Sequence, residues 1–234
     1  MQRVVVITGA TSGYGLAMAR KFHENGDRVI AVSRSAEKVE RVVRENGFYA
    51  GYTMDVRCAQ EWEGLCAFVR EKAGRVDVLV NNAGGGVCIR DTVEQTAEQM
   101  QEAVALNLLS VLYGCRVFGR WMKEQGEGTV VNIASVCATH CWPGWSVYAA
   151  AKAGVLNFTK GFYTEMQPFG VRASCVIPAA AATGFQHSAG IGEEHQSLRP
   201  EDIAEAVFYV AGQPKGVWVE DMTVWGTSQA VQPL

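Results

Sequence analysis

The sequence has no run of basic residues, and its formal net charge is only −3. Proteins that bind nucleic acid or anionic membranes carry clustered lysines and arginines, so this pattern argues against both kinds of partner. No apolar stretch approaches the roughly 20 residues that span a bilayer. No secretion signal is visible before the first expected strand. We therefore expect a cytoplasmic protein with no membrane partner.

The seven cysteines include no Cys-x-x-Cys pair and no metal-type spacing. In a chain without an export signal they are expected to be reduced thiols, most of them small core residues. The segment Cys137–Cys141, which contains His140, is the one cluster that invites a zinc interpretation. No second group of ligands accompanies it, so we expect no bound metal.

No repeat, low-complexity segment or linker interrupts the 234 residues, a length that suits one α/β domain. Apolar, β-branched runs alternate with helical patterns along the whole chain. This alternation predicts one domain, residues 1–234, built on a Rossmann-like, doubly wound parallel sheet of about seven strands with helices on both faces. Strands are expected at 4–7, 29–33, 48–54, 76–81, 128–134, 171–177 and 217–224. Helices are expected at 16–26, 36–45, 60–72, 97–124, 148–166 and 201–211.

A glycine-rich turn follows the first expected strand, with Gly9, Gly13 and Gly15 directly before a helix. Glycines let the backbone approach a pyrophosphate, and the N–H groups and dipole of the helix favour its charge. The spacing GxxxGxG differs from the more common GxGxxG. Taken alone, the turn is equally compatible with a purely structural role.

Tyr148 and Lys152 are spaced so that one helix face presents a phenol and an ammonium together. A free tyrosine has a pKa near ~10, and a neighbouring cation is expected to lower it toward the range of a general acid/base. Ser135 would hold a substrate oxygen while Tyr148 moves the proton. Taken alone, the pair is also typical of a core tyrosine beside a surface lysine.

In their order along the chain, these motifs resemble those of the short-chain dehydrogenase/reductase family, in its single-domain branch. The matching residues are Thr8-Gly9-x-x-x-Gly13-x-Gly15, Asn81-Asn82-Ala83-Gly84, Asn107, Ser135, Tyr148 and Lys152. The resemblance covers essentially the whole chain and implies hydride transfer between nicotinamide C4 and a carbonyl carbon. It implies Tyr148 as general acid/base, Lys152 on the nicotinamide ribose, Ser135 on the substrate oxygen, and Asn107 supporting a relay water.

The region after the second strand lacks the carboxylate with which NAD sites usually hold the ribose 2′-hydroxyl. It reads Ser33-Arg34-Ser35, whose guanidinium and hydroxyls suit a 2′-phosphate, so we predict NADP(H) over NAD(H). The alternative is that Arg34 only caps a surface turn. By resemblance the cofactor contacts are Gly9, Thr11, Ser12, Gly13, Tyr14, Gly15, Ser33, Arg34, Asp55, Val56, Asn82, Ala83, Gly84, Tyr148, Lys152, Pro178 and Thr183. Ala179 stands where the family usually has glycine, which would disturb the turn if that position needs a positive φ.

The substrate pocket is expected to be built from residues 85–91 and 136–147 under a lid at about 184–198. Its candidate residues are Cys137, His140, Trp142, Trp145 and Phe185. The tryptophans can wall an apolar pocket or pack against a neighbouring subunit. The C-terminal stretch 199–229 resembles the branch that oxidises serine and 3-hydroxy acids. A carboxylate substrate would need a fixed cation, and Arg90 is the only nearby candidate before Arg199. A reductase for a bulkier, apolar ketone or aldehyde fits the tryptophans equally.

A dinucleotide-binding sensor or scaffold of the same fold is the alternative to an enzyme. The presence of both Tyr148 and Lys152 favours the enzyme. The helix that carries them has small residues at Ala149–Ala151, Ala153 and Gly154. Together with the helix at 97–124 it would form a four-helix bundle in a homodimer or homotetramer, unless the small residues serve packing within one subunit.

Overall fold

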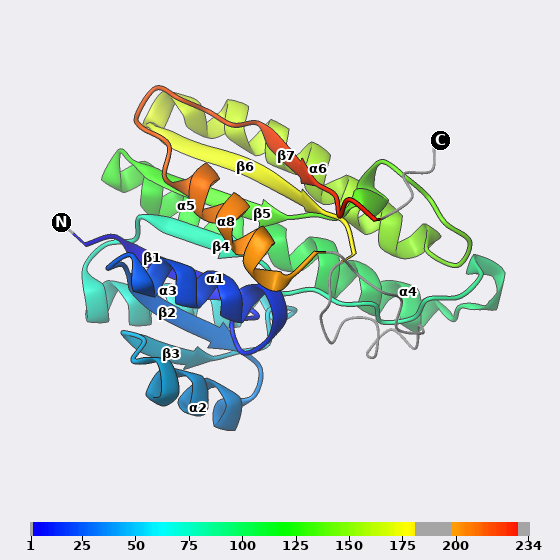
Figure 1. Ribbon diagram of the computed structural model, residues 1–234, viewed down its shortest axis with the longest axis horizontal. Helices are drawn as coiled ribbons and strands as arrows, with labels where there is room; N and C mark the ends of the chain where they lie inside the picture. Colours follow the sequence, from blue (N-terminus) through cyan, green and yellow to red (C-terminus); the bar gives the residue numbers. More distant parts are fainter. Residues whose placement is uncertain (1, 181–197, 229–234) are drawn as a thin grey trace.

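The computed structural model describes residues 2–180 and 198–228, which fold around one parallel sheet (Figure 1). The strand order is β3-β2-β1-β4-β5-β6-β7. The strands are β1 (Val4–Thr8), β2 (Arg28–Ser33), β3 (Ala50–Thr53), β4 (Val78–Asn81), β5 (Gly128–Ile133), β6 (Val171–Pro178) and β7 (Asp221–Val224). The order reverses between β1 and β4, and this switch point is where such sheets bind ligands. The predicted doubly wound fold is confirmed, with β3 and β7 shorter than expected.

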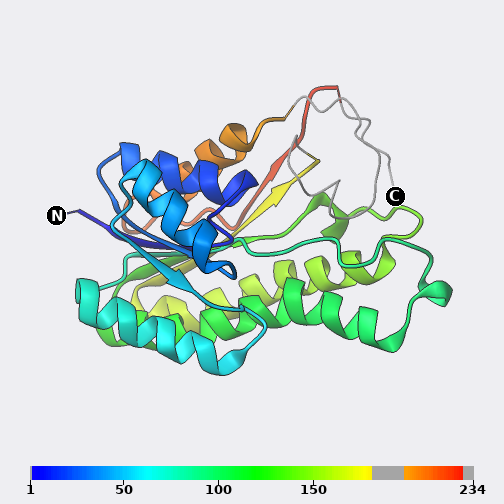
Figure 2. The same ribbon diagram turned by 90° about the horizontal axis from the view of Figure 1, so that it is seen from below.

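The helices cover both faces of the sheet. They are α1 (Gly13–Glu24), α2 (Ala36–Asn46), α3 (Ala59–Ala73), α4 (Ala97–Val104), α5 (Ser110–Gln125), α6 (Ser146–Met166) and α8 (Pro200–Ala211). Figure 2 shows α1, α2 and α8 on one face and α3, α5 and α6 on the other. The central strands are therefore enclosed on both sides, and every residue of β1 and β4 is buried. This burial explains why both strands are continuous apolar runs and not alternating ones.

The single helix predicted at 97–124 is interrupted. A π-helical turn (Ala105–Leu109) separates α4 from α5, and its central residue, Asn107, is fully buried. The Asn107 amide Nδ2 donates to the carbonyl of Ala103 at 3.0 Å and to that of Gly85 at 2.9 Å. A wide turn of this kind often marks a functional position in a helix.

The helical run Ala97–Gln125 is the one segment of the described residues that is long and apolar enough, by composition alone, to cross a membrane. Half of its most apolar window is buried inside the structure. Its C-terminal part, α5, packs against α3, α6 and β5. A buried core helix has the same composition, so this run is weak support for a membrane segment.

A buried polar network joins the elements on which the site is built. Asn132 of β5 accepts a hydrogen bond from Asn81 of β4 at 2.8 Å and donates one to Thr159 of α6 at 2.9 Å. All three side chains are at most 3% exposed. Because buried amides and hydroxyls are costly to leave unpaired, the network holds β4, β5 and α6 in one register.

Candidate active site

The glycine turn after β1 forms a cradle that no side chain could enter. A Cβ placed on Gly15 would lie 2.1 Å from the carbonyl oxygen of Gly9, and Gly9 and Gly13 have φ values of 69° and 49°. Ser12 caps α1 without a side-chain hydrogen bond, so its hydroxyl leaves the first-turn N–H groups open. Such a turn at a helix N-terminus fits a pyrophosphate, as the spacing of the glycines predicts.

The two halves of the nucleotide motif are bonded to each other. The hydroxyl oxygen of Thr8, at the end of β1, accepts from the backbone N–H groups of Asn82 and Ala83, both at 3.0 Å. The Asn82 amide in turn donates to the Thr8 carbonyl at 2.9 Å. The loop after β4 is therefore held directly beside the glycine turn, and Gly84 follows in the same loop.

The residues proposed for a 2′-phosphate gather at the end of β2. Thr11 Oγ1 donates to Ser33 Oγ at 3.1 Å, which joins the glycine turn to β2. Ser35 caps α2 by accepting from the Lys38 N–H, so the helix cap is Ser35 and not Arg34. Arg34 is exposed, and its guanidinium has no hydrogen-bond partner in the described ranges.

Asp55 and Val56, expected near the adenine, follow β3. Hydrogen bonds from Arg57 hold the pKa of the Asp55 carboxyl below its usual range, with a smaller contribution from the charge of Arg34. Arg57 also bonds Glu102 of α4 at 2.7 Å. Val56 is buried, and its carbonyl accepts from the indole N–H of Trp62 at 2.9 Å.

Ser135, Tyr148 and Lys152 converge where β5 ends and α6 begins. Ser135 opens a short 3-10 turn (Val136–Ala138), and its hydroxyl oxygen accepts from the Cys137 N–H at 3.2 Å. Tyr148 and Lys152 are 8% and 4% exposed, and the Lys152 ammonium lies 5.8 Å from the centre of the Tyr148 ring. The spacing of the pair on one helix face is as predicted.

The electrostatics of the pair differ from the prediction. Burial raises the pKa of Tyr148, and a hydrogen bond with the Ser135 hydroxyl opposes this rise. Burial lowers the pKa of Lys152 to about 8. The Lys152 ammonium donates to the carbonyl of Ile133 at 2.9 Å, so it is directed to the backbone. The phenol is therefore held protonated at neutral pH, which suits a proton donor.

Asn107 lies beside this pair. Its Oδ1 accepts from the Gly85 N–H at 3.0 Å. A Cβ on Gly84 would lie 2.9 Å from that Oδ1 and 3.3 Å from the Lys152 ammonium. Because Gly84 has no side chain, the loop after β4 can approach both the Asn107 amide and the Lys152 ammonium.

Pro178 ends β6, and Ala179 follows it with ordinary backbone geometry. None of the described non-glycine residues has a positive φ, so alanine is tolerated where the family usually has glycine. Ala179 donates its N–H to Val224 at 2.9 Å and accepts from the Tyr14 hydroxyl at 3.1 Å. Tyr14 thus joins the glycine turn to the end of β6. Thr183, Phe185 and nearly all of the predicted lid at 184–198 lie outside the described residues.

The expected pocket residues lie around Tyr148. Cys137, Tyr148 and Ala149 form a small apolar cluster against which Ile89, Trp142 and Trp145 pack. His140 lies between Trp142 and Trp225. Ile89 belongs to the segment 85–91 that was expected to line the pocket. Sequence reasoning missed Trp225, although it directly follows the end of β7, where ligands bind in such sheets.

No group of three or more potential metal ligands occurs within residues 2–180 and 198–228. Burial raises the pKa of the Cys137 thiol, which makes it a poor metal ligand and nucleophile.

A glycine cradle at the switch point, with a buried tyrosine–lysine pair and a half-buried serine beside it, defines a dinucleotide-dependent oxidoreductase. The family model for short chain dehydrogenase matches residues 3–194. A 2-(R)-hydroxypropyl-CoM dehydrogenase from Xanthobacter autotrophicus (strain Py2) is 38% identical, covering 91% of this chain and 92% of its own length. The chain belongs to the short-chain dehydrogenase/reductase family.

Two solved structures extend the likeness. An alcohol dehydrogenase from the archaeon Thermococcus sibiricus, complexed with 5-hydroxy-NADP, is 29% identical with a TM-score of 0.89 over 100% of both chains. A closed form of serine dehydrogenase complexed with NADP+ is 27% identical with a TM-score of 0.93, covering 99% of this chain and 98% of the other.

The buried charge of Lys152 should lower the free energy of unfolding, and this effect can be measured. The amine is charged in both folded and unfolded chains below its folded pKa of about 8, and neutral in both above its ordinary pKa of 10.5. The folded state therefore pays for the buried charge at low pH and is relieved of it as the pH rises from 8 to 10.5. At pH 7, Lys152→Met is expected to raise the free energy of unfolding by about 1–3 kcal/mol.

Urea unfolding of the wild type and the variant at pH 7 and pH 10 measures this effect. The gain should shrink at pH 10, where the wild-type lysine is largely neutral when folded. The exposed Lys38→Met is the control, with no gain expected at either pH. Destabilisation by Lys152→Met at pH 7 would contradict the prediction.

Proposed function

We propose that the protein transfers a hydride between NADP(H) and a carbonyl or secondary alcohol, with Tyr148 as general acid/base. The proposal is supported most by one observation: a buried phenol stands beside the Ser135 hydroxyl and a buried ammonium, and burial raises the pKa of the phenol. The nicotinamide supplies the hydride chemistry, and the chain supplies the proton and the orientation. A non-catalytic sensor would not need this costly burial of Lys152.

Each residue has a role that follows from its contacts. In reduction, the Tyr148 hydroxyl gives its proton to the carbonyl oxygen as the alkoxide develops, and in oxidation it takes that proton back. The Ser135 hydroxyl, beside the phenol, would donate to the same oxygen and orient it. Lys152 would hold the nicotinamide ribose, since its ammonium lies next to Gly84 in the nucleotide loop. Asn107 fixes that loop through both polar groups of Gly85.

Tyr148→Phe removes the proton donor and keeps the ring packing. Turnover should fall by about 10²–10⁴, the usual size of general acid/base catalysis. The measurement is NADPH oxidation with a panel of ketones, aldehydes and keto acids. Tyr209→Phe, at an exposed tyrosine on α8, is the matched control and should behave as wild type. Retention of turnover within a factor of about ten in Tyr148→Phe would refute the role.

The preference for NADP(H) follows from the end of β2. The exposed guanidinium of Arg34 and the hydroxyls of Thr11, Ser33 and Ser35 present donors, and no carboxylate stands among them. A 2′-phosphate is recognised by such donors, whereas a 2′-hydroxyl is best held by an acid. The alcohol and serine dehydrogenases named above carry NADP-type cofactors in their crystals, which agrees.

Arg34→Asp replaces the phosphate partner with an acceptor for the 2′-hydroxyl. We expect the ratio of NADPH to NADH affinity to fall by about 10²-fold, because a charge-assisted contact is lost and a repulsion is gained. Titration of both cofactors by fluorescence gives the two Kd values. Arg41→Asp, an exposed arginine on α2, is the control for the added charge. An unchanged preference in Arg34→Asp would exclude Arg34 as the discriminating residue.

A serine or 3-hydroxy acid dehydrogenase is the second candidate, and the TM-score of 0.93 to a serine dehydrogenase favours it. Its substrate carboxylate would need a cation near Tyr148. Arg90 is the candidate: its backbone lies within 3.5 Å of a Cβ placed on Gly144, and its side chain is exposed. Reduction of NADP+ by L-serine or 3-hydroxybutyrate would support this candidate.

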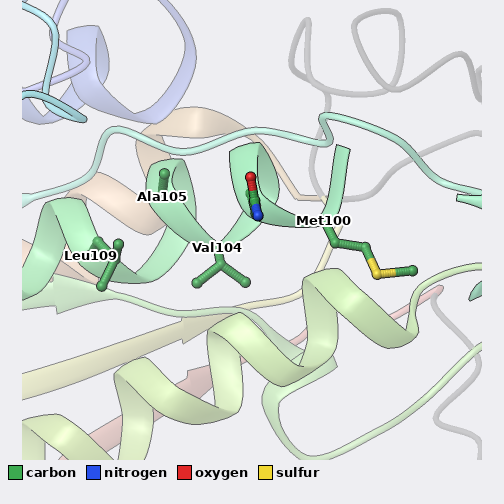
Figure 3. Close-up of a pocket in the computed structure, with 5 residues that line it drawn as sticks. Met100, Val104, Ala105 and Leu109 are labelled. Atoms are coloured by element: carbon green, nitrogen blue, oxygen red, sulfur yellow. The ribbon is translucent and has the colours of Figure 1, made fainter. Parts of the chain in front are cut away.

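We also propose that two copies of the chain pair through the helical run Ala97–Gln125. Figure 3 shows Met100, Val104, Ala105 and Leu109 following one another along this run beside α6. With Gln101 they line an apolar hollow of about 420 Å3. The small residues of α6 serve packing within one chain in part, since a Cβ on Gly154 would lie 3.0 Å from Leu108.

All seven cysteines are free thiols, which supports a reducing, cytoplasmic compartment.

Val104→Glu places a charge in the centre of this apolar hollow. Sedimentation velocity at micromolar concentration should show a dimer or tetramer for the wild type and a shift toward monomer for the variant, because the charge would be desolvated in the contact. Glu98→Gln, on the exposed start of α4, is the control and should keep the wild-type state. A monomeric wild type would reject the proposed contact.

A further inference from the structure

Four aromatic side chains gather near Tyr148, in one group of three rings and one ring in direct contact with the tyrosine. The His140 and Trp142 rings stack, with centroids 6.2 Å apart and an interplanar angle of 28°. The Trp225 ring meets His140 edge-on, at 5.4 Å and 83°. The Trp145 ring meets Tyr148 at 5.5 Å and 73°. We call His140, Trp142, Trp145 and Trp225 the aromatic wall.

The aromatic wall is assembled from two distant parts of the chain. His140, Trp142 and Trp145 stand between β5 and α6, whereas Trp225 directly follows β7. The parallel pairing of β6 with β7, in which Pro178 lies opposite Val224, carries Trp225 to the carboxyl end of the sheet. Thr139 Oγ1 contacts His140 Nδ1 at 2.9 Å and fixes the orientation of the imidazole ring. The wall is therefore held in place by the sheet and by its own loop.

Two rings of the aromatic wall contact the residues around Tyr148. Trp142 and Trp145 pack against the cluster of Cys137, Tyr148 and Ala149. Trp142 and Trp145 therefore connect the other two rings of the wall to the surroundings of Tyr148. All four wall residues are half-buried, so part of the surface of each residue is exposed. Aromatic rings gain from edge and offset contacts with other rings beyond the area that they bury.

Within the described residues, the Lys152 ammonium is a charged group beside the Tyr148 ring, at 5.8 Å from the ring centre. Among the described residues, Cys137, Ser135 and Tyr14 act on the pKa of Tyr148 besides burial. None of the three is ionised at neutral pH. Within the described ranges, Arg90 is the one guanidinium near the pocket loop, and it is exposed. A buried carboxylate without a cation partner would be strongly disfavoured here, whereas a neutral group would not.

We propose that the substrate is a neutral ketone, or the corresponding secondary alcohol, that carries an aromatic ring, and that this ring lies on the aromatic wall. The proposal rests on the proposed function and names its substrate class. In reduction, a hydride from NADPH forms the new C–H bond as the carbonyl π bond breaks, and the Tyr148 proton forms the O–H bond. The two electrons of the hydride would leave the cofactor oxidised as NADP+, and the Tyr148 phenolate would regain its proton from solvent.

The test compares ketones that share one reacting group. In 4-phenylbutan-2-one the carbonyl is insulated from the ring, so it differs from butan-2-one mainly by the phenyl group. We expect kcat/KM with NADPH to be at least about 30-fold higher for the phenyl ketone, in the range that apolar pocket contacts supply. The anion 3-oxobutanoate should be the poorest of the three substrates. A higher kcat/KM for either butan-2-one or 3-oxobutanoate would overturn the proposal.

Variants of the wall link this preference to its residues. Trp225→Ala should bring the ratio of the two neutral ketones down by about tenfold or more, and Trp225→Phe should restore most of it, because a ring is present again. Trp218→Phe is the matched control, since Trp218 stacks on Tyr163 at 3.6 Å and bonds the Ala173 carbonyl, apart from the wall. A ratio that does not change in Trp225→Ala would overturn the assignment.

A binding measurement separates this inference from the proposed function. Calorimetric titration of the NADP+ complex with 4-phenylbutan-2-one gives a Kd without any turnover. Saturable binding that weakens at least tenfold in Trp225→Ala, with no reduction of any ketone, would support the wall and refute the enzyme. Reduction of all ketones without a phenyl preference, together with equal Kd values in wild type and Trp225→Ala, would refute the wall and leave the enzyme.

Discussion

The structure depends on the parallel pairing of two fully buried strands, β1 and β4, at the centre of the sheet. Their ends are locked together where the Thr8 hydroxyl accepts from Asn82 and Ala83. This contact brings the glycine cradle and the loop carrying Gly84 into one crevice, although the two segments are far apart in the chain. Any loosening of the pair would separate the halves of the nucleotide site.

The catalytic group is held by a second set of buried contacts. Asn132 joins β4, β5 and α6 below the positions of Ser135 and Tyr148, and the Lys152 ammonium is anchored on the Ile133 carbonyl. Removing the ammonium from water lowers its pKa and destabilises its charged form. The fold accepts this cost at a site whose proposed chemistry requires a lysine, as is common where function and stability compete.

The chemistry of the pocket beside Tyr148 is set by the side chains that line it. Rings of His140, Trp142, Trp145 and Trp225 offer apolar and π contacts, and the apolar residues Cys137 and Ala149 pack with Tyr148. In such a setting, specificity comes from shape and ring contact more than from charge. The fold alone does not set the substrate, because function resides in the site and not in the fold.

The sequence by itself determined the fold class, the family, the glycine turn and the spacing of Tyr148 with Lys152, because these depend on local patterns and short motifs. It predicted a lowered pKa for Tyr148, whereas burial raises that pKa. The spacing of Tyr148 and Lys152 shows that the two groups are neighbours, but it does not show how far they are removed from water. It missed the π-turn at Asn107, because apolar periodicity does not report one extra residue in a helical turn. Only the tertiary structure decided that Ala179 is unstrained and that Trp225 stands beside His140. Both facts depend on the pairing of β6 with β7, a contact between segments whose separation along the chain leaves no local signal.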